Sequence, residues 1–366
     1  MNFLFYVPQM ASYGGMERHV CLLATLLAKR GHTVTLLTTS NSLNPATREE
    51  LVGLGIRLRE LPAARGDASK AKKMGWLLLQ ALRQRFHSAD LIYTNGQSGL
   101  ARTVWLAAGR RTRVVHHHHT AGDPKEQTTW HPAFRQTLKV APEVVACSVT
   151  TKGHLETAAG RSDVDFLPYL TPEILPSSAV SERCYSAASA LHIGFIGRLV
   201  PTKGIDTLCA LSQAPQLAGV QWHVHGAGPD YPASYFDAFP NVRYHGPFQG
   251  PAEASAILQR LDALALFSRH NEGMPLSLIE AMAAGLPWIA TDQGGTREMA
   301  VEARNCELVT ADAAFDEILA GTLAFVDRIR SGKTSRVAQR RVYDLHFAPT
   351  TVGRRWLEFF GCPQPV

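Results

Sequence analysis

The segment that most constrains the fold is a run of apolar residues between two prolines in the second half of the chain. Pro275 suits the first position of a helix, because its missing N–H would be unpaired there anyway, and Gly285 followed by Pro287 suits a helix end. The side chains between them are apolar on every side: Leu276, Leu278, Ile279, Ala281, Met282, Ala283 and Ala284. A helix of this composition is typical of the interior of a large protein.

Glu280 is the exception in this helix. Burying even an unpaired neutral polar group costs about 2–7 kcal/mol, so a hydrogen-bond donor or a cation must reach this carboxylate. Gly273 and Met274 lie just before the helix, where unpaired N–H groups and the positive end of the dipole favour an anion or a sugar hydroxyl. Glu272 stands at the same mouth. The pattern therefore predicts a ligand site at this helix start, and an internal salt bridge is the alternative.

The length and composition of the chain limit its class. Its 366 residues are 45% hydrophobic and 19% charged, which is typical of a globular protein with about two domains. No apolar run approaches the ~18–20 residues of a membrane span. Residues 1–7 lack a basic leader and are expected to form a strand. The six cysteines show no paired close spacing, so we expect reduced thiols in the cytoplasm, without a disulfide framework or a zinc site.

Strands and helices alternate along the first half, which favours an α/β fold with a parallel sheet. One helix is expected at Met16–Arg30, because its apolar residues share one stripe and Gly31 follows it. The expected strands of the first half are 2–7, 33–38, 56–60, 90–93, 113–115, 143–147 and 163–167. A stretch rich in Pro, Ser and Ala, residues 168–190, indicates a connection between domains. New strands are expected from Leu191 and at 262–267 and 288–291.

Charge is divided unevenly between the two halves of the chain. Residues 1–170 hold 21 Lys and Arg against 12 Asp and Glu, a net charge of +9, whereas residues 171–366 hold 16 against 19, a net charge of −3. The first half is therefore the better candidate to face an anionic partner. Nucleic acid is not expected, because we find no helix-turn-helix, zinc-finger or aromatic stacking motif.

Residues 65–86 combine positive charge with an apolar stripe. The basic residues are Lys70, Lys72, Lys73, Arg83 and Arg85, and the stripe is Met74, Leu77, Leu78, Ala81 and Leu82. An ordinary sheet-covering helix with a solvated charged face is the favoured interpretation. Attachment to an anionic membrane surface is the alternative.

Two strand-to-helix loops carry groups that suit phosphate. Gly14 and Gly15 follow the first expected strand, and paired glycines let a phosphate approach the backbone closely, although a plain turn is their commoner role. Arg198 and Lys203 flank the turn after the strand at Leu191. They can deliver two cations to one diphosphate, Arg as a planar fork and Lys as a point charge.

Four consecutive histidines, His116 to His119, follow another expected strand, at the carboxyl edge where α/β sheets bind ligands. They do not suit a single metal ion, because consecutive residues leaving a strand point in alternating directions. His117 and His119 share one side of an extended chain, and the other two are expected to be packing or solvent histidines.

Together these motifs resemble the retaining nucleotide-sugar glycosyltransferases of family 4. The resemblance rests on the pair Glu272 and Glu280, on Gly-Arg198-Leu-Val-Pro-Thr-Lys203-Gly, and on Gly294-Gly-Thr-Arg-Glu298. It covers nearly the whole chain, with its specific motifs in residues 194–298. There are two departures. Phe267 stands where Pro is usual and Cys306 where Gly is common, and both affect local loop shape rather than chemistry.

The resemblance implies a GT-B architecture of two Rossmann-like parallel-sheet domains facing a cleft. Residues 1–170 would bind the acceptor, 171–190 would be the linker, and 191–345 would bind the nucleotide sugar. Residues 346–366, with a helix at Pro349–Phe360, would cross back onto the first domain.

The resemblance also implies which residues form the site. Lys203 and Arg198 would stabilise the leaving diphosphate, Glu272 would lie by the donor sugar, and Glu280 would take the two ribose hydroxyls. His119, with His117 as second choice, would face the donor sugar. The expected catalytic residues are thus His119, Arg198, Lys203 and Glu272; the expected donor-binding residues are Gly14, Gly15, Gly273, Met274, Pro275, Leu276 and Glu280. Residues 224–229 and 242–249 would pass near the base. No metal or other cofactor is expected.

The expected reaction moves a sugar from a nucleotide-diphosphate sugar to a hydroxyl with retention at the anomeric carbon. The basic first domain favours a lipid-linked glycan of a surface polysaccharide as acceptor, at the inner face of the cell membrane or in the cytoplasm, and a soluble metabolite is the alternative. Two other classes stay open. An epimerase of the same fold would consume donor without acceptor, and a nucleotide-sugar-binding protein would have no turnover.

Overall fold

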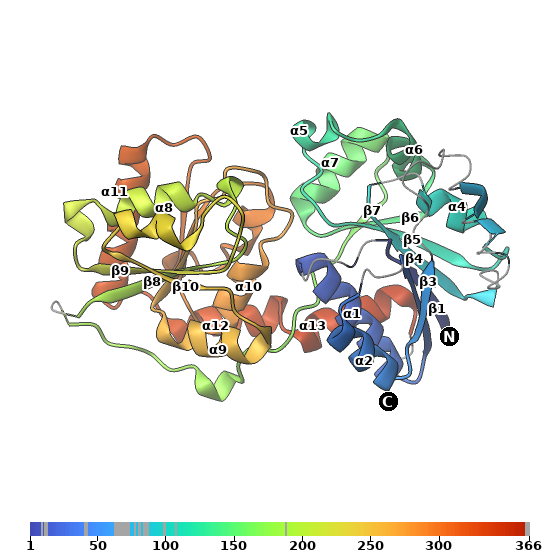
Figure 1. Ribbon diagram of the computed structural model, residues 1–366, viewed down its shortest axis with the longest axis horizontal. Coiled ribbons are helices and arrows are strands. Elements are labelled where there is room, and N and C mark those ends of the chain that lie inside the picture. Colours follow the sequence, from blue (N-terminus) through green and yellow to red (C-terminus); the bar gives the residue numbers. More distant parts are fainter. Residues whose placement is uncertain are drawn as a thin grey trace. The chain divides into compact units, whose positions relative to one another are not determined.

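The computed structural model describes residues 1–8, 10, 14–39, 43–61, 74–76, 78–79, 82, 88–97, 100–106, 108–186 and 189–362. These residues form two compact units. Unit 1 comprises residues 1–171 and 352–366, and unit 2 comprises residues 172–351. Each unit is a parallel sheet with helices on both faces (Figure 1), as the alternation of strands and helices predicts.

The sheet of unit 1 has seven parallel strands in the order β3-β2-β1-β4-β5-β6-β7. The strands are β1 Asn2–Tyr6, β2 Thr33–Thr39, β3 Arg57–Leu61, β4 Leu91–Asn95, β5 Arg113–His118, β6 Glu143–Ala146 and β7 Val164–Phe166. The helices are α1 Gly15–Lys29, α2 Pro45–Gly53, α4 Leu100–Leu106, α5 Pro124–Gln127, α6 Pro132–Val140, α7 Val149–Ala159 and the end of α13 Pro349–Phe360. Most expected strand ends are matched within two residues, the usual uncertainty of such boundaries.

The two faces of this sheet are covered by different helices. α1 and α13 pack on one face, where Val20, Leu23 and Leu27 of α1 join Trp356 and Phe360 of α13 in one buried cluster. α6 and α7 cover the other face (Figure 1). The stripe expected on α1 is therefore its buried face. The last helix, from Val352 onward, belongs to unit 1, and the Trp356 indole N–H donates to the Pro168 carbonyl at 2.9 Å.

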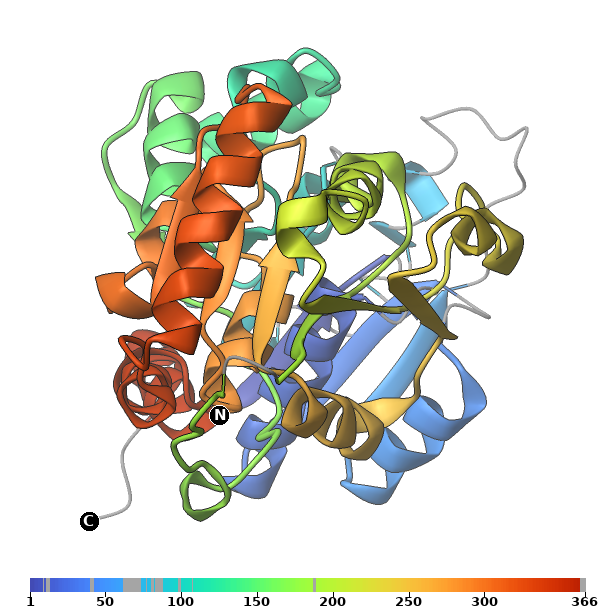
Figure 2. The ribbon, with the colours of Figure 1, turned by 90° about the vertical axis from the view of Figure 1, so that its left-hand side faces the viewer.

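The sheet of unit 2 has six parallel strands in the order β10-β9-β8-β11-β12-β13. They are β8 Leu191–Ile196, β9 Val220–His225, β10 Val242–Gly246, β11 Ala263–Leu266, β12 Trp288–Thr291 and β13 Cys306–Val309. The helices are α8 Ile205–Ser212, α9 Gly250–Arg260, α10 Leu276–Ala283, α11 Phe315–Arg330 and α12 Arg336–His346. α8 and α11 cover one side of this sheet, and α9, α10 and α12 lie on the other (Figures 1 and 2).

α10 is the apolar helix on which the sequence interpretation depends, and it is buried as expected: every residue from Leu278 to Ala283 is buried, including Glu280. Its start differs by one position. Pro275, expected as the first helical residue, is the cap before it, with φ −72° and ψ 107°. Gly285, at φ +69°, ends the helix as predicted.

Two buried arginines of α12 satisfy the carbonyls at the end of α10. Arg336 donates to the Ala284 carbonyl at 3.0 Å, and Arg340 donates to the Ala283 carbonyl at 2.8 Å. The last carbonyls of a helix have no partner within the helix and carry its negative dipole end, so cations are stabilising there. α12 thereby fixes the orientation of α10.

Among the described residues, no helix is both long and apolar enough to cross a membrane. Most of the basic segment 65–86 lies outside the described residues, so its two interpretations stay predictions.

Candidate functional site

Each sheet has one point where the chain reverses its direction of winding. In unit 2 it lies between β8 and β11, and in unit 1 between β1 and β4. Ligands of open α/β sheets bind outside the carboxyl ends of the strands at such a point. The loop with Arg198 and Lys203 follows β8, the Glu272 loop follows β11, and Gly14 and Gly15 are the cap and first residue of α1, which follows β1. The predicted motifs thus occupy the switch points of both units.

Lys203 and Glu272 form an ion pair between the two switch-point loops of unit 2. The Lys203 Nζ lies 2.6 Å from a Glu272 carboxylate oxygen, and the Ser268 hydroxyl donates to the same oxygen. Burial would raise the pKa of Glu272, but the charge of Lys203 and then that of His270 hold it below its usual range. The carboxylate is therefore ionised near neutral pH, and an ammonium group stands directly beside it.

Two glycines let these loops approach closely. A Cβ at Gly204, which has φ +71°, would lie 1.9 Å from the Phe267 carbonyl oxygen. A Cβ at Gly294 would lie 2.1 Å from the Glu272 carbonyl oxygen, which accepts the Gly295 N–H at 2.8 Å. Only glycine fits where a left-handed residue also touches neighbouring backbone. The Gly294-Gly motif therefore supports the backbone of Glu272.

The other predicted residues of unit 2 lie on the same two loops or on α10. Gly273 to Pro275 connect Glu272 to α10, whose Leu276 begins the helix and whose Glu280 is 4% exposed. Arg198 lies in the β8 loop, five positions before Lys203. Its side chain is exposed, and within the described part of the chain it has no hydrogen bond or ion pair. The fold thus joins Lys203 to Glu272 directly, whereas Arg198 extends into solvent.

In unit 1, the glycine pair starts α1, but one of its N–H groups already has an acceptor. The Gly14 N–H donates to a carboxylate oxygen of Glu17 at 3.1 Å, in a capping arrangement. An anion that uses this N–H must displace Glu17. Across the switch point, the Asn95 amide at the end of β4 contacts the Met16 sulfur at 3.1 Å.

The histidine run lies further into the sheet than expected. β5 continues through His118, so the first three histidines are strand residues that pair with β4 and β6. The predicted strand of 113–115 was too short, because a histidine with buried partners tolerates a strand interior as well as an edge. His117 and His119 do lie on one side, with ring centroids 4.0 Å apart.

His117 and His119 share the Tyr93 hydroxyl, which lies 2.7 Å from Nδ1 of His117 and 3.2 Å from Nε2 of His119. Tyr169 stacks on His119 and donates to its carbonyl at 2.6 Å. Burial, and then neighbouring histidines, lower the pKa of both rings well below the ordinary value. They are neutral at physiological pH and offer hydrogen bonds rather than charge.

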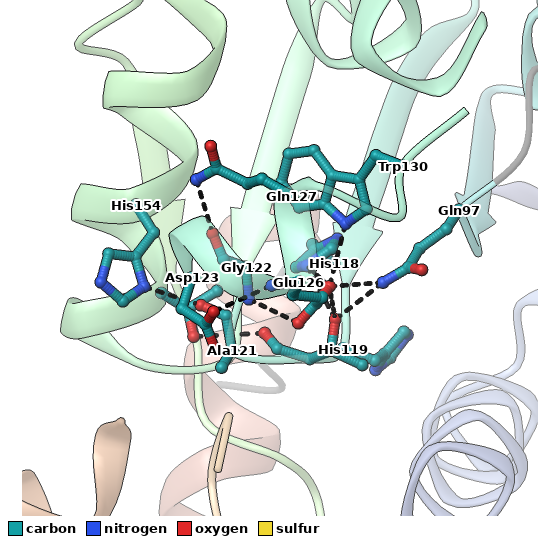
Figure 3. Close-up of polar contacts among 12 residues, drawn as sticks. Gln97, His118, His119, Ala121, Gly122, Asp123, Glu126, Gln127, Trp130 and His154 are labelled. Atoms are coloured by element: carbon teal, nitrogen blue, oxygen red, sulfur yellow. Dashed lines mark hydrogen bonds and ion pairs between the residues drawn. The ribbon is translucent and has the colours of Figure 1, made fainter. Parts of the chain in front are cut away.

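The expectation of packing or solvent roles for the other two histidines holds for His116, which is fully buried beside Thr94 and Phe134. His118 instead belongs to a polar network at the same edge (Figure 3). Its Nε2 lies 2.9 Å from the Thr120 hydroxyl and 3.4 Å from a carboxylate oxygen of Glu126.

Glu126 is the centre of this network, because its carboxylate also accepts from the Gly122 N–H, the Trp130 indole and the Gln97 amide (Figure 3). Burial would raise the pKa of Glu126, but the hydrogen bond and charge of His118 lower it to about 2. Most of this cluster comes from residues 118–130, and Gln97 reaches it from a separate segment, after β4. Tyr93 and Tyr169 were missed because they reach the histidines from distant segments, whereas Ser268 was missed although it stands only four residues before Glu272.

Asp163 and Asp165 form an Asp-x-Asp pattern, which in some sugar transferases holds a metal. Here Asp165 lies in β7, the edge strand of unit 1, and Asp163 comes just before that strand and is paired with Arg161 at 2.6 Å. Two residues separated by one position in an extended chain point to the same side. Among the described residues, however, no other acidic residue or histidine joins Asp163 and Asp165 to complete a possible metal site.

Two family models match the chain. One, described as "Glycosyltransferase Family 4", matches residues 13–168, and the other, described as "Glycosyl transferases group 1", matches residues 190–325. The first match lies in unit 1 and the second in unit 2. Together they include the paired glycines, the histidine run, the cationic loop and both glutamates.

Curated relatives point the same way. A D-inositol 3-phosphate glycosyltransferase of Gordonia bronchialis is 26% identical over 388 residues, covering 90% of this chain and 81% of the relative. A GDP-mannose-dependent alpha-mannosyltransferase of Mycolicibacterium smegmatis is 28% identical over 174 residues, which is 48% of this chain and only 42% of the relative's length.

Among solved structures, Anabaena Alr3699/HepE in complex with UDP and glucose is similar in fold. Its TM-score is 0.74, the match covers 99% of both chains, and 19% of the residues are identical. The expected architecture of two Rossmann-like parallel-sheet domains is therefore confirmed. The chain belongs to the family 4, group 1 glycosyltransferases and is a glycosyltransferase with the GT-B fold.

Proposed function

We propose that this enzyme transfers a sugar, with retention, from a nucleoside-diphosphate sugar to a hydroxyl of a glycan acceptor, and that unit 2 holds the donor. The observation that carries the proposal is the Lys203–Glu272 pair beside the start of α10. A cation, a carboxylate and a helix N-terminus meet there at a sheet switch point, which suits a sugar diphosphate. The UDP in the HepE structure and the GDP-mannose in the relative's name support a nucleotide-sugar donor.

In this proposal the diphosphate lies between Lys203 and the N–H groups before α10, and Arg198 folds onto it from solvent. Positive groups aimed at the leaving phosphate stabilise the charge that develops as the bond to the sugar breaks. Glu280 receives the ribose hydroxyls on the first turns of α10. Glu272 fixes Lys203 and lies by the sugar.

The proposed transfer takes place on one face of the sugar. The bond from the anomeric carbon to the diphosphate oxygen breaks, and the acceptor oxygen forms its bond on the same side. The departing phosphate oxygen takes the proton of the acceptor hydroxyl, so no protein base is needed. Glu272 then acts as an electrostatic and positioning group, because its carboxylate is already engaged by Lys203 and Ser268.

Unit 1 would bind the acceptor. The net charge of +9 in residues 1–170 favours an anionic acceptor, and neutral His117 and His119 suit sugar hydroxyls. We take a lipid-diphosphate-linked glycan of a surface polysaccharide as the acceptor class. The alternative is a soluble phosphorylated acceptor, which the relative named for inositol 3-phosphate supports. Transfer to a membrane-extractable glycan, with none to soluble sugar phosphates, separates the two.

Neutralisation of the diphosphate by protein groups alone is part of the proposal. Lys203, Arg198 and the α10 N-terminus supply the positive charge that a divalent cation provides elsewhere. The measurement is the transfer rate with EDTA and with added Mg²⁺ or Mn²⁺. Equal rates support the proposal, and a rate that requires the cation contradicts it.

Attachment of residues 65–86 to an anionic inner leaflet is a further part of the proposal, argued from their basic composition. The full-length enzyme should sediment with vesicles that contain anionic lipid and stay in solution with neutral ones. Equal behaviour with both kinds of vesicle would refute membrane attachment and leave the transfer reaction untouched.

The decisive experiment screens nucleoside diphosphates and then their sugars. A nucleotide that binds the folded protein raises its melting temperature, so thermal shifts identify the base without knowledge of the acceptor. The matching donor is then offered with and without acceptor, and products are analysed by mass spectrometry and NMR. Donor converted to an epimer without acceptor would indicate the epimerase alternative, and no nucleotide shift at all would contradict the proposal.

A further inference from the structure

Unit 2 contains a second group of histidines, on strands that the Lys203 and Glu272 loops do not use. His223 and His225 are two residues apart on β9, so their side chains emerge from the same face of the sheet. Each is 9% exposed. Such a pair on a strand presents two imidazoles side by side, as metal sites on sheets require.

A β-bulge in the edge strand β10 brings a third ring to this pair. Tyr244 pairs with Val224 and Gly246 pairs with His225, so His245 is the extra residue between two paired positions. A bulge re-aims the inserted side chain. The His245 ring stacks on His225 with centroids 4.2 Å apart, and its Nε2 lies 2.9 Å from Nδ1 of His223.

The orientation of His223 is fixed from its other side. Its Nε2 lies 2.9 Å from Nδ1 of His192 on β8, and the His192 backbone N–H donates to an Asp262 carboxylate oxygen at 2.9 Å. With the proton on Nε2 of His223, shared with His192, the Nδ1 lone pair points toward His245. Outer hydrogen bonds of this kind set the tautomer of metal-binding histidines.

We propose that His223, His225 and His245 form a binding site for one divalent transition-metal ion of the zinc class. The three residues each offer a ring nitrogen within 4.8 Å of the other two. Tetrahedral zinc with nitrogen ligands at about 2.0–2.1 Å needs nitrogens roughly 3.4 Å apart, which small rotations of these rings reach. Three imidazoles suit Zn²⁺, Co²⁺, Ni²⁺ or Cu²⁺ rather than Mg²⁺ or Ca²⁺.

The protonation state of the cluster agrees with this geometry. Burial, followed by the neighbouring histidines, lowers the pKa of His223 to about 4 and that of His225 to about 3. Both rings are therefore neutral and available as ligands at physiological pH. Arg243 and Arg260 are the positive groups near the cluster, and Asp262 is the nearby acid. The ion would thus have a neutral ligand set and an open fourth position.

The bound ion would have a structural and regulatory effect rather than a part in transfer. β10 is the edge strand, and the Gly226 N–H after β9 donates to the Gly246 carbonyl at 2.8 Å. The Tyr244 hydroxyl also donates to the Gly226 carbonyl at 3.1 Å. An ion that joins β9 to β10 would fix these two loops, which the family resemblance places near the nucleotide base.

The test uses tag-free, chelator-treated protein and titrates it with Co²⁺. Tetrahedral Co²⁺ in a nitrogen site gives visible absorption bands, and the expected stoichiometry is one ion that Zn²⁺ displaces. His245→Ala, at an exposed position, should weaken Co²⁺ binding at least tenfold and remove the rise in melting temperature with Zn²⁺. His346→Ala, also exposed but on α12, is the matched control and should bind as the wild type does.

A second variant separates this cluster from the histidine run of unit 1. His119→Ala should retain one Co²⁺ with unchanged absorption, because His119 lies on a different unit. Absence of stoichiometric Co²⁺ binding in the wild type would overturn the proposal and leave a hydrogen-bonded row of neutral histidines. Binding that survives His245→Ala but is lost in His119→Ala would overturn it equally. None of these readouts depends on the transfer reaction.

Discussion

The switch points of the two units differ in how they hold their polar groups. In unit 2 the loops after β8 and β11 are locked by an ion pair and by glycines whose backbone touches the opposing loop. In unit 1 the equivalent edge holds neutral histidines, stacked on Tyr169 and hydrogen bonded to Tyr93. Fixed charge suits a diphosphate whose charge is always present, whereas neutral donors and acceptors suit hydroxyls.

The two units also differ in how they offset the cost of burying a titratable side chain. Glu272 is buried with a cation beside it, so it remains ionised. The histidines of unit 1 are buried among other rings and lose their charge. Substitutions in unit 2 should therefore alter the charge of the donor site and the binding of the nucleotide. Substitutions in unit 1 should alter histidine protonation and the binding of the acceptor.

The largest effect is expected from Lys203→Ala. The substitution removes the cation beside the leaving diphosphate and leaves Glu272 as a buried carboxylate without its ammonium partner. Turnover should fall roughly 10²- to 10³-fold, the cost of losing one group that stabilises developing charge. Steady-state transfer rates measure it, with Lys333→Ala at an exposed position as control. A wild-type rate in Lys203→Ala would break the contrast between the units.

Glu280→Ala should act on binding rather than on turnover. Hydrogen bonds to a charged group contribute about 1.5–3 kcal/mol, so the dissociation constant of the nucleotide should rise roughly 10- to 100-fold. Calorimetric titration of the nucleotide gives the constant. Glu317→Ala, on the exposed start of α11, is the control and should bind normally. Unchanged affinity in Glu280→Ala would remove this residue from the donor site.

Substitutions at two glycines of unit 2 test whether the close contact between its loops contributes to stability. Gly204 and Gly332 have similar positive φ angles, +71° and +68°, but only at Gly204 would a Cβ meet another atom within 4 Å. Both Ala variants carry the left-handed strain of about 1–2 kcal/mol. The free energy of unfolding should therefore fall by at least about 1 kcal/mol more for Gly204→Ala in urea titrations. Equal losses would show that the loop contact is dispensable.

The smallest effect is a pH dependence from the histidines of unit 1. Burial lowers the pKa of His19 and of His116 to about 3, from an ordinary 6.5. The unfolded chain therefore binds more protons between pH 6.5 and 3, and stability, complete above pH 6.5, declines as the pH falls through that range. Each ring should lower the free energy of unfolding by up to roughly 1.4 kcal/mol for each unit by which the pH falls.

Urea titrations at pH 7.5 and 5.5 test this dependence. The loss between the two pH values should be smaller in His116→Phe than in the wild type, and unchanged in His346→Phe, an exposed control. A loss in His116→Phe as large as in the wild type would mean that His116 is charged in the folded protein.

The sequence predicted local elements well because their causes are local. The stripe of α1, the apolar α10 and the glycine at its end each follow from residues within a few positions. Arg336 and Arg340 could not be predicted as the groups that cap α10, because they lie about 50 residues from it along the chain. Gln97 in the Glu126 network and Tyr93 beside His117 are likewise brought to their partners only by the sheet.

The motifs of the site were predictable for a different reason. Lys203 and Glu272 stand in loops whose glycines and prolines leave a readable pattern, and the family resemblance placed both residues at the donor, but it predicted no contact between them. Their 2.6 Å contact depends on β8 and β11 being neighbours in the sheet, which the spacing of residues along the sequence does not predict. Gly14 shows the opposite case: its pattern suggested that a phosphate could approach the backbone closely, whereas its N–H donates to a carboxylate oxygen of Glu17.

The most direct test of the central claim locates the nucleotide by hydrogen exchange. The full-length enzyme is measured with and without a saturating amount of the nucleoside diphosphate found in the thermal screen. Amides in residues 197–204 and 272–276 of unit 2 should exchange more slowly when the nucleotide is bound, and those of residues 117–120 in unit 1 should not change. Protection at 117–120 with no change in the two unit 2 loops would contradict the account.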